Sequence, residues 1–346
     1  MKRIMEHGGD WTGRLLDFSA NVSPLGLPEG VRQAAAKALE RSDRYPDPLC
    51  RDLRRAIGEA EGVPAAWCLC GNGAADLIFR AALAARPQKA LVTAPAFSEY
   101  EAALRTAGCG EIERYPLRPE EDFRLGEDFL NALTPGTELA FLCQPNNPTG
   151  VTVEKKLLCR ILDRCGEINC RLVLDECFLN FLDVPEAYTL KPRLGERPGL
   201  LLLRAFTKFC AMAGLRLGYA LCADEDFLEA MRRAGQPWSV SAPAQAAGMA
   251  ALREREYGEA LRALVSRERP RMLRGLRELG LRTVPGEANF LLFQSPVPLD
   301  EPLRERGLLL RSCGGFHGLD GSWYRAALRR EEENDRLLEA LGEVLR

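Results

Sequence analysis

Residues 200–219 of this chain read LLLLRAFTKFCAMAGLRLGY, and this stretch decides the fold. Its four leucines form an apolar run that predicts a strand buried on both faces of a sheet. Lys208 follows that strand within one helical turn. Because a buried ammonium group is costly, burial would lower the pKa of Lys208 and suit the residue to Schiff-base chemistry. The alternative is an ordinary surface lysine, and the remaining strand ends decide between the two.

Similar short apolar runs recur on both sides of this strand, and segments with helical spacing separate most of them. The predicted strands are 67–70, 90–93, 139–143, 172–174, 200–203 and 219–222. Strands that alternate with helices are typical of an α/β fold in which a mostly parallel sheet is covered on both faces. We therefore predict one large α/β domain over residues 42–250.

The last part of the chain predicts a second, smaller α/β domain over residues 251–346. A long amphipathic segment at about 244–279 contains Pro270, which is expected to start a new helix or to kink this one. After it come strand-like runs at 290–293, 308–310 and 324–328 and a C-terminal amphipathic helix. Residues 1–41 form a predicted N-terminal arm, with a helix over 31–41, that packs with the small domain.

Composition and charge argue against several classes of function. The 346 residues include 47 Lys+Arg and 49 Asp+Glu, so the net charge of −2 argues against a nucleic-acid partner. No apolar run is long enough to span a membrane, and no secretory signal is recognised at the start, so we expect a cytoplasmic protein. The twelve cysteines lack a Cys-x-x-Cys pair and the chain has two histidines, so no metal site is predicted.

Three other predicted strands also end in unusual polar residues. The turn 71–73, Gly-Asn-Gly, opens a helix whose N-terminus suits a phosphate, although a plain tight turn is the alternative. Asn147 lies in the rigid polar turn QPNNPTG at 144–150, which on local features alone is equally a simple turn. Asp175 directly follows a buried strand, where it needs a cationic partner such as a protonated ring nitrogen, or serves as a helix N-cap. Ligands of open α/β sheets bind at such strand ends.

Together these motifs resemble the fold-type I aminotransferases, which use pyridoxal 5′-phosphate (PLP). The resemblance covers nearly the whole chain and rests on Asn-Pro-Thr-Gly at 147–150, Asp-Glu at 175–176, Thr-Lys at 207–208 and Gly-Leu-Arg-Leu-Gly at 214–218. It implies that Lys208 binds the cofactor covalently and shuttles protons, and that Asp175 pairs with the ring nitrogen. It implies further cofactor contacts for Gly73, Ala74, Thr207 and Arg216 at the phosphate, Asn147 at O3′, Phe97 on the ring face, and Tyr45 at the phosphate of the neighbouring subunit of a homodimer.

The N-terminal residues are similar to one branch of this family, the threonine-phosphate decarboxylases of cobalamin biosynthesis. His7-Gly8-Gly9 and the segment DFSANVSPLG at 17–26 carry this resemblance. It implies decarboxylation of a phosphorylated amino acid, L-threonine O-3-phosphate. The implied substrate-binding residues are His7, Asn21, Arg311 and Arg325, the last on the α-carboxylate. A histidinol-phosphate-type aminotransferase, which transfers the amino group to 2-oxoglutarate, is the alternative.

One position departs from the family pattern. Many members carry a tyrosine three residues after the aspartate, whose hydroxyl reaches O3′, and this chain has Phe178 there. Asn147 would then be the main donor to O3′. Two readings from other classes remain: a nucleotide-dependent dehydrogenase built on the turn 71–73, which leaves Lys208 and Asn147 without a role, and a PLP-fold protein that has lost catalysis.

Overall fold

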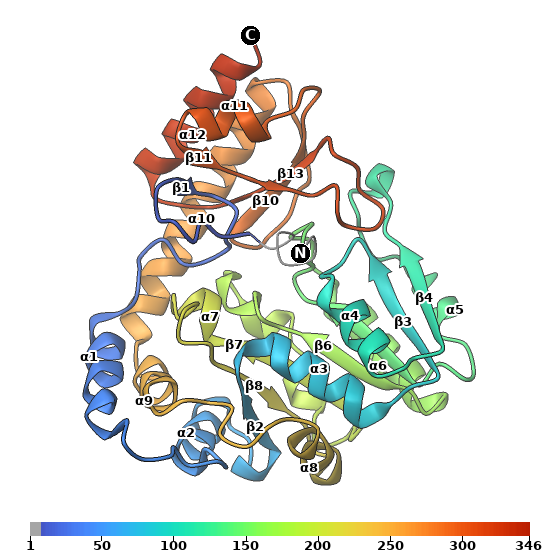
Figure 1. Ribbon diagram of the computed structural model, residues 1–346. Coiled ribbons are helices and arrows are strands. Elements are labelled where there is room, and N and C mark those ends of the chain that lie inside the picture. The colour runs from blue at the N-terminus through green and yellow to red at the C-terminus, as the bar shows by residue number, and fades with distance from the viewer. Residues whose placement is uncertain (1–7) are drawn as a thin grey trace.

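The computed structural model describes residues 8–346, and its largest element is a seven-stranded sheet (Figure 1). The strand order is β2-β8-β7-β6-β5-β3-β4. In chain order the strands are β2 (Cys68–Gly71), β3 (Lys89–Ala94), β4 (Glu111–Pro116), β5 (Leu139–Cys143), β6 (Arg171–Asp175), β7 (Leu200–Ala205) and β8 (Gly218–Leu221). Strands β3 to β7 pair in parallel, and β8 alone runs antiparallel to its neighbours. This confirms the predicted mostly parallel sheet.

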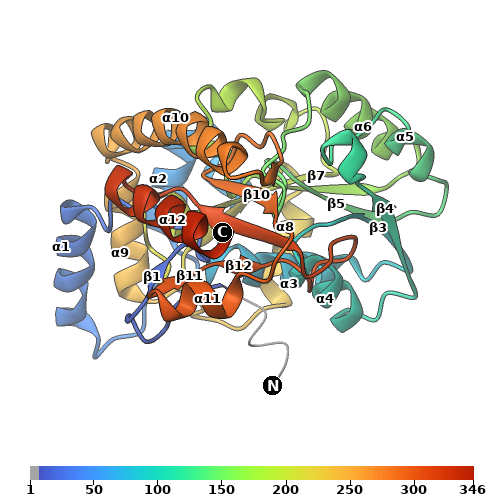
Figure 2. The same cartoon turned by 90° about the horizontal axis from the view of Figure 1, so that it is seen from above.

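The leucines of β7 show why the sheet needs cover on both faces. Leu201 and Leu203 belong to the apolar core on one face, and Leu200 and Leu202 belong to the core on the other, as the alternation of side chains along a strand requires. The first face is covered by α3 (Gly73–Ala85), α4 (Glu99–Thr106) and α8 (Glu225–Arg233), and the second by α5 (Phe129–Ala132) and α6 (Lys155–Glu167) (Figure 2).

Strand β4 is the one strand of the large sheet that the sequence pattern missed. It pairs only with β3 at the sheet edge, and its side chains are exposed or half-buried. An edge strand faces water, so it needs no apolar run and carries charged residues instead. The other six predicted strands agree with the structure to within two residues at each end.

A four-stranded antiparallel sheet lies above the large one in Figure 1, in the order β12-β13-β10-β9. Its strands are β9 (Arg282–Thr283), β10 (Phe290–Gln294), β12 (Arg311–Ser312) and β13 (Trp323–Ala327). It packs with α10 (Arg255–Glu278), α11 (Asp300–Glu305) and α12 (Glu331–Val344). The N-terminal segment joins this region because β1 (Leu16–Asp17) pairs in parallel with β11 (Leu308–Leu309).

Four further helices complete the fold. They are α1 (Glu29–Ala38), α2 (Arg51–Glu61), α7 (Phe206–Phe209) and α9 (Ala242–Ala251). Short 3-10 helices occupy several loops: η2 (Leu39–Arg41), η3 (Ala65–Trp67), η4 (Pro119–Glu121), η5 (Leu179–Phe181), η6 (Pro185–Ala187) and η7 (Lys191–Arg193). Helix α1 packs against α9, and the backbone N–H of Ala327 in β13 donates to the carbonyl of Phe18 at 2.8 Å, so residues 8–41 contact both the small sheet and the large region. The domain limits at residues 41 and 250 stay predictions.

Pro270 does not start a new helix, so that alternative was wrong, while a kink at this residue stays a prediction. The amphipathic segment divides between α9 and α10 at residues 252–254, and Pro270 lies inside α10. Proline removes one backbone hydrogen bond, but Val265 and Met272 on either side are fully buried, so packing holds the helix together. Among the helices of residues 8–346, none is long and apolar enough to cross a membrane.

Candidate active site

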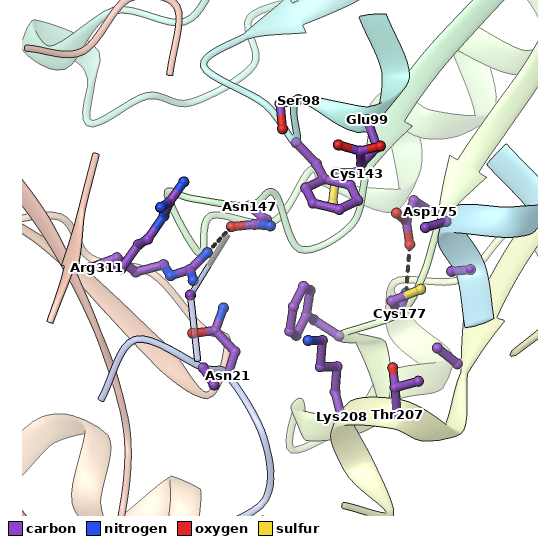
Figure 3. A pocket seen from close by; sticks show the side chains of 18 of the residues that line it. Asn21, Ser98, Glu99, Cys143, Asn147, Asp175, Cys177, Thr207, Lys208 and Arg311 are labelled. Carbon is purple, nitrogen blue, oxygen red and sulfur yellow. Dashed lines mark hydrogen bonds between the residues drawn. The ribbon is translucent and has the colours of Figure 1, made fainter. Parts of the chain in front are cut away.

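A cavity of about 340 Å³ lies at the carboxyl ends of β5, β6 and β7, beside Arg311 of the small sheet (Figure 3). Ten of the predicted site residues line it: Ala74, Phe97, Asn147, Asp175, Thr207, Lys208, Arg216, Asn21, Arg311 and Arg325. Figure 3 shows Lys208 and Asp175 on one side of the cavity, and Arg311 and Asn21 on the other. The structure thus brings together strand ends that are far apart in the sequence.

Three predicted residues are not among those that line the cavity. Gly73 lies beside it, and a Cβ atom there would come within 2.7 Å of Arg216 Nη2. Tyr45 is 81% exposed and stacks on Trp238, with ring centroids 4.6 Å apart, so it does not reach the cavity of its own chain. His7 lies outside the described residues.

Lys208 reaches the cavity because helix α7 begins directly after strand β7. Burial, and after it the positive charge of Arg325, lower the pKa of Lys208 to about 8. This confirms the direction expected from its place after an apolar strand. A lysine with this pKa is partly unprotonated near neutral pH and can act as a nucleophile.

Asp175 ends strand β6 and is 4% exposed. Its Oδ1 accepts a hydrogen bond from the backbone N–H of Cys177 at 3.0 Å, and its Oδ2 accepts one from the hydroxyl of Tyr100 at 2.7 Å. Burial raises the pKa of Asp175, whereas these hydrogen bonds and the charge of Lys208 lower it in part. Within residues 8–346 this carboxylate has no salt-bridge partner, so a cationic ligand group would complete its surroundings.

Two arginines of the small sheet lie directly opposite each other, since Arg311 of β12 and Arg325 of β13 are register partners. Arg325 donates from Nη1 to Asn147 Oδ1 and from Nη2 to the carbonyl of Ser19 at 2.9 Å. In the part of the chain that the structure describes, its buried Nε has no hydrogen-bond partner. Burial lowers the pKa of Arg325 to about 10, and Arg311 contributes repulsion. Like charges opposite each other destabilise a sheet, so this pair is suited to an anionic ligand.

The N-terminal segment closes another side of the cavity. The backbone N–H of Ser23 donates to the carbonyl of Lys208 at 2.9 Å, which holds the segment against the lysine. Asn21 is 2% exposed and lines the cavity, and its Oδ1 has no hydrogen-bond partner among residues 8–346. A buried amide oxygen without a partner is costly, so a ligand donor would stabilise it.

The predicted phosphate corner is built at the start of helix α3. Gly73 has φ +79°, which favours glycine, and the Arg216 guanidinium lies against it. The turn is fixed from behind, because Asp76 accepts from the Asn72 N–H at 2.8 Å and from Arg80 Nε at 2.8 Å. The N–H groups at this helix start, together with Thr207 and Arg216, can bind a phosphate.

A family model for aminotransferase class I and II matches residues 14–341. The chain belongs to this family. The match confirms the family predicted from the motifs, and PLP is the cofactor of this family. The solved structure of histidinol-phosphate aminotransferase from Clostridium acetobutylicum superposes with a TM-score of 0.89 at 26% identity, covering 96% of this chain and 99% of that one. The predicted fold-type I architecture is therefore confirmed.

Two family members illustrate the range of activities among the relatives. Threonine-phosphate decarboxylase of Salmonella typhimurium is 42% identical over 336 residues, which cover 96% of this chain and 92% of the relative. Histidinol-phosphate aminotransferase of Desulfitobacterium hafniense (strain DSM 10664 / DCB-2) is 35% identical over 340 residues, which cover 95% of this chain and 91% of the relative.

The residues of the cavity fit PLP at each of its reactive ends. Lys208 has a lowered pKa suited to an aldehyde, and Asp175 lacks a cation that a protonated ring nitrogen would supply. The start of α3 and Arg216 offer donors to a phosphate. The volume is within the range of cofactor pockets.

Several residues of the cavity were missed by the sequence analysis. Ser19, Cys143, Cys177 and Phe316 line it, and Tyr100 contacts Asp175 from behind. Phe178, noted as a departure from the family, lines the cavity and packs edge-on against Phe290 at 5.0 Å. Phe178 apart, these residues carry no local signal, because their positions in the cavity arise from contacts across long sequence separations.

Proposed function

We propose that this chain decarboxylates L-threonine O-3-phosphate to (R)-1-amino-2-propanol O-2-phosphate, a step of cobalamin biosynthesis. The observation that carries this proposal is the 42% identity to a threonine-phosphate decarboxylase over 96% of the chain, against 35% for a histidinol-phosphate aminotransferase. The facing pair Arg311 and Arg325 supports it, since the substrate carries two anionic groups, a phosphate and a carboxylate.

Three residues of the chain would bind the reactive part of the cofactor. When bound, PLP supplies an electron sink for the electron pair released at the substrate α-carbon. Lys208 would hold the cofactor and return a proton to that carbon, and Asp175 would face the ring nitrogen. Asn147 would donate to O3′, because Arg325 already occupies its amide oxygen and leaves the amide N–H groups for the cofactor.

The cofactor phosphate would bind at the start of helix α3. Gly73 and Ala74 would offer backbone N–H groups, and Thr207 and Arg216 would donate from their side chains. Phe97 would lie on the ring face. The side chains of these residues, Gly73 apart, line one cavity, which supports the assignment.

Substrate orientation would decide between losing carbon dioxide and losing the α-proton. When bound, the cofactor would weaken the substrate bond that overlaps the π system of its ring. We expect His7, Asn21, Arg311 and Arg325 to bind the two anionic groups, with Arg325 at the α-carboxylate. Anchoring of the phosphate would then turn the carboxylate upright. Each repositioned charged hydrogen bond is worth about 1.5–3 kcal/mol, which is enough to set the orientation.

We also propose a homodimer in the cytoplasm. Tyr45 and Trp238 form an exposed aromatic stack away from the cavity of their own chain, which supports a role for Tyr45 at the cofactor phosphate of the partner subunit. All twelve cysteines are free thiols and most are buried, as expected in a reducing compartment. Sedimentation analysis should give a dimer, and a monomer with full activity would contradict the role of Tyr45.

The direct test is to incubate the PLP-loaded protein with L-threonine O-3-phosphate and to measure carbon dioxide. We expect release of carbon dioxide with formation of the amino alcohol phosphate and no amino transfer to 2-oxoglutarate. If the protein instead transfers the amino group of histidinol phosphate to 2-oxoglutarate and releases no carbon dioxide, it is an aminotransferase and the proposal is wrong.

A further inference from the structure

Tyr100 lies behind the cavity on helix α4 and has no predicted role. Its ring is 1% exposed and stacks on Phe141 of β5, with centroids 5.0 Å apart and an angle of 12° between the planes. Its edge meets Phe97, the residue expected on the cofactor ring face, at 5.8 Å. Because Phe141 and Phe97 hold the ring in place, the phenol hydroxyl points toward strand β6.

The hydroxyl of Tyr100 donates to Asp175 Oδ2 at 2.7 Å. The other carboxylate oxygen accepts from the backbone N–H of Cys177 at 3.0 Å. Each oxygen of Asp175 is therefore held by a donor from a different segment, and Tyr100 is 75 residues away in the sequence. Donors on both oxygens fix the plane of the carboxylate as well as its position.

The other ionisable groups that face Asp175 are Cys143, Cys177 and Lys208. Cys143 is the register partner of Asp175 on strand β5. Burial raises the pKa of both thiols and of the Tyr100 phenol, so all three remain neutral donors at neutral pH. Lys208 is the one cation among these groups, and its charge favours the charged form of Asp175.

We propose that Tyr100 is a positioning residue that acts through Asp175: its hydroxyl keeps the carboxylate charged and aimed at the ring nitrogen of the cofactor. A hydrogen bond to the charged form of an acid favours that form. A carboxylate kept charged in turn favours a protonated ring nitrogen, which is what makes the ring an electron sink. This inference rests on the cofactor of the family and is independent of the proposed decarboxylation.

The test compares the affinity of the apoprotein for two ligands, PLP and an analogue in which carbon replaces the ring nitrogen. We expect Tyr100→Phe, which keeps the stacked ring, to weaken PLP binding about tenfold. The same substitution should change analogue binding less than about twofold, because the analogue has no nitrogen for Asp175 to pair with. Equal weakening of both ligands would mean that Tyr100 only packs the site, and would overturn the proposal.

Tyr115→Phe is the matched control. Tyr115 makes the same kind of hydrogen bond, at 2.7 Å to Asp128 Oδ1, but away from the cavity. It should leave the affinity for both ligands unchanged. Thermal unfolding of each apoprotein checks that the variants are folded.

A second measurement tests whether Tyr100 acts through Asp175 or through the general packing of the pocket. In an Asp175→Asn background, Tyr100→Phe should weaken PLP binding no further, because the carboxylate through which it acts is gone. The affinity of the otherwise unchanged protein should fall as Asp175 is protonated at low pH, and Tyr100→Phe should move that fall to higher pH. An unchanged midpoint, or a full additional loss in the Asp175→Asn background, would contradict the proposal. Neither measurement uses the substrate, so a failed decarboxylase assay leaves them interpretable.

Discussion

Two clusters of buried charge lie at the same edge of the large sheet, and they differ in how their charges are satisfied. Behind the cavity is the Arg204 cluster, which consists of Glu61, Glu176, Thr189, Lys191, Arg204 and Tyr219. Arg204 donates to Glu176 at 2.7 Å and to Glu61 at 2.8 Å, and Lys191 also pairs with Glu61 at 3.0 Å. Burial would raise the pKa of Glu61, but the charge of Arg204 and the hydrogen bond from Tyr219 lower it overall. Each charge in this cluster has an opposite partner.

The cavity shows the reverse pattern, although its residues are close neighbours of that cluster in the sequence. Asp175 precedes Glu176, and Lys208 is four residues after Arg204. Burial raises the pKa of Asp175 and lowers those of Lys208 and Arg325, so the protein itself does not stabilise their charged forms fully. The charges of the Arg204 cluster are therefore paired within the chain, whereas the charged groups of the cavity need a ligand to pair with them.

The largest expected effect is on catalysis at the cavity. If Lys208 has the proposed roles, Lys208→Ala should lower the rate of carbon dioxide release from L-threonine O-3-phosphate by about 10⁴-fold or more, since it would remove both the covalent link to the cofactor and a proton donor. Lys37→Ala, at an exposed position on helix α1, should leave the rate unchanged. A Lys208→Ala protein that keeps a tenth of the rate would show that another group supplies the amine and the proton.

Loss of an arginine should affect the stability of the two clusters differently. Arg204→Met should lower the free energy of unfolding of the apoprotein by about 3–5 kcal/mol, because Glu61 and Glu176 lose their buried partner. Arg325→Met should cost less than about 1 kcal/mol or even stabilise the apoprotein, since its charge is poorly satisfied there. Urea unfolding measures both, and similar losses would remove the distinction between the clusters.

The pH dependence of stability tests the cavity alone. The pKa of Lys208 falls from 10.5 to about 8 on folding, so between these values unfolding takes up a proton and the folded apoprotein becomes more stable as the pH rises. The gain should approach about 3 kcal/mol when the pH rises from 8 to 10.5. It should be absent from Lys208→Met, and urea unfolding across this range checks it. A gain that persists in Lys208→Met belongs to another group.

The smallest effect is expected at the phosphate corner. Gly73→Ala should weaken PLP binding roughly tenfold, because the new Cβ displaces the Arg216 guanidinium. Gly62→Ala is the matched control, since Gly62 has a similar φ of +69° with no atoms near its Cβ position. Both should lose about 1 kcal/mol of stability from backbone strain, but Gly62→Ala should bind PLP normally. Equal affinities for the two variants would argue against a phosphate at this corner.

The sequence by itself determined the large sheet, the family and the residues at the strand ends. Each of these follows from neighbouring residues: the apolar run before Lys208, the acid that follows the strand at Asp175, and the turn that contains Asn147. Local patterns of this kind set backbone conformation and therefore can be read without contacts. The edge strand β4 was not predicted, because its exposed position at the sheet edge requires no apolar pattern. The division between α9 and α10 was not predicted either, because packing determines where these helices end and begin.

The tertiary structure alone decided how the charges are paired. Tyr100 reaches Asp175, Arg311 lies opposite Arg325, and Arg204 joins Glu61 to Glu176, each across a distance in sequence that no motif spans. The free energy of a buried charge depends on what lies within a few ångströms of it. Chain folding sets that distance, so two adjacent acids with similar sequence surroundings, Asp175 and Glu176, end in opposite electrostatic states.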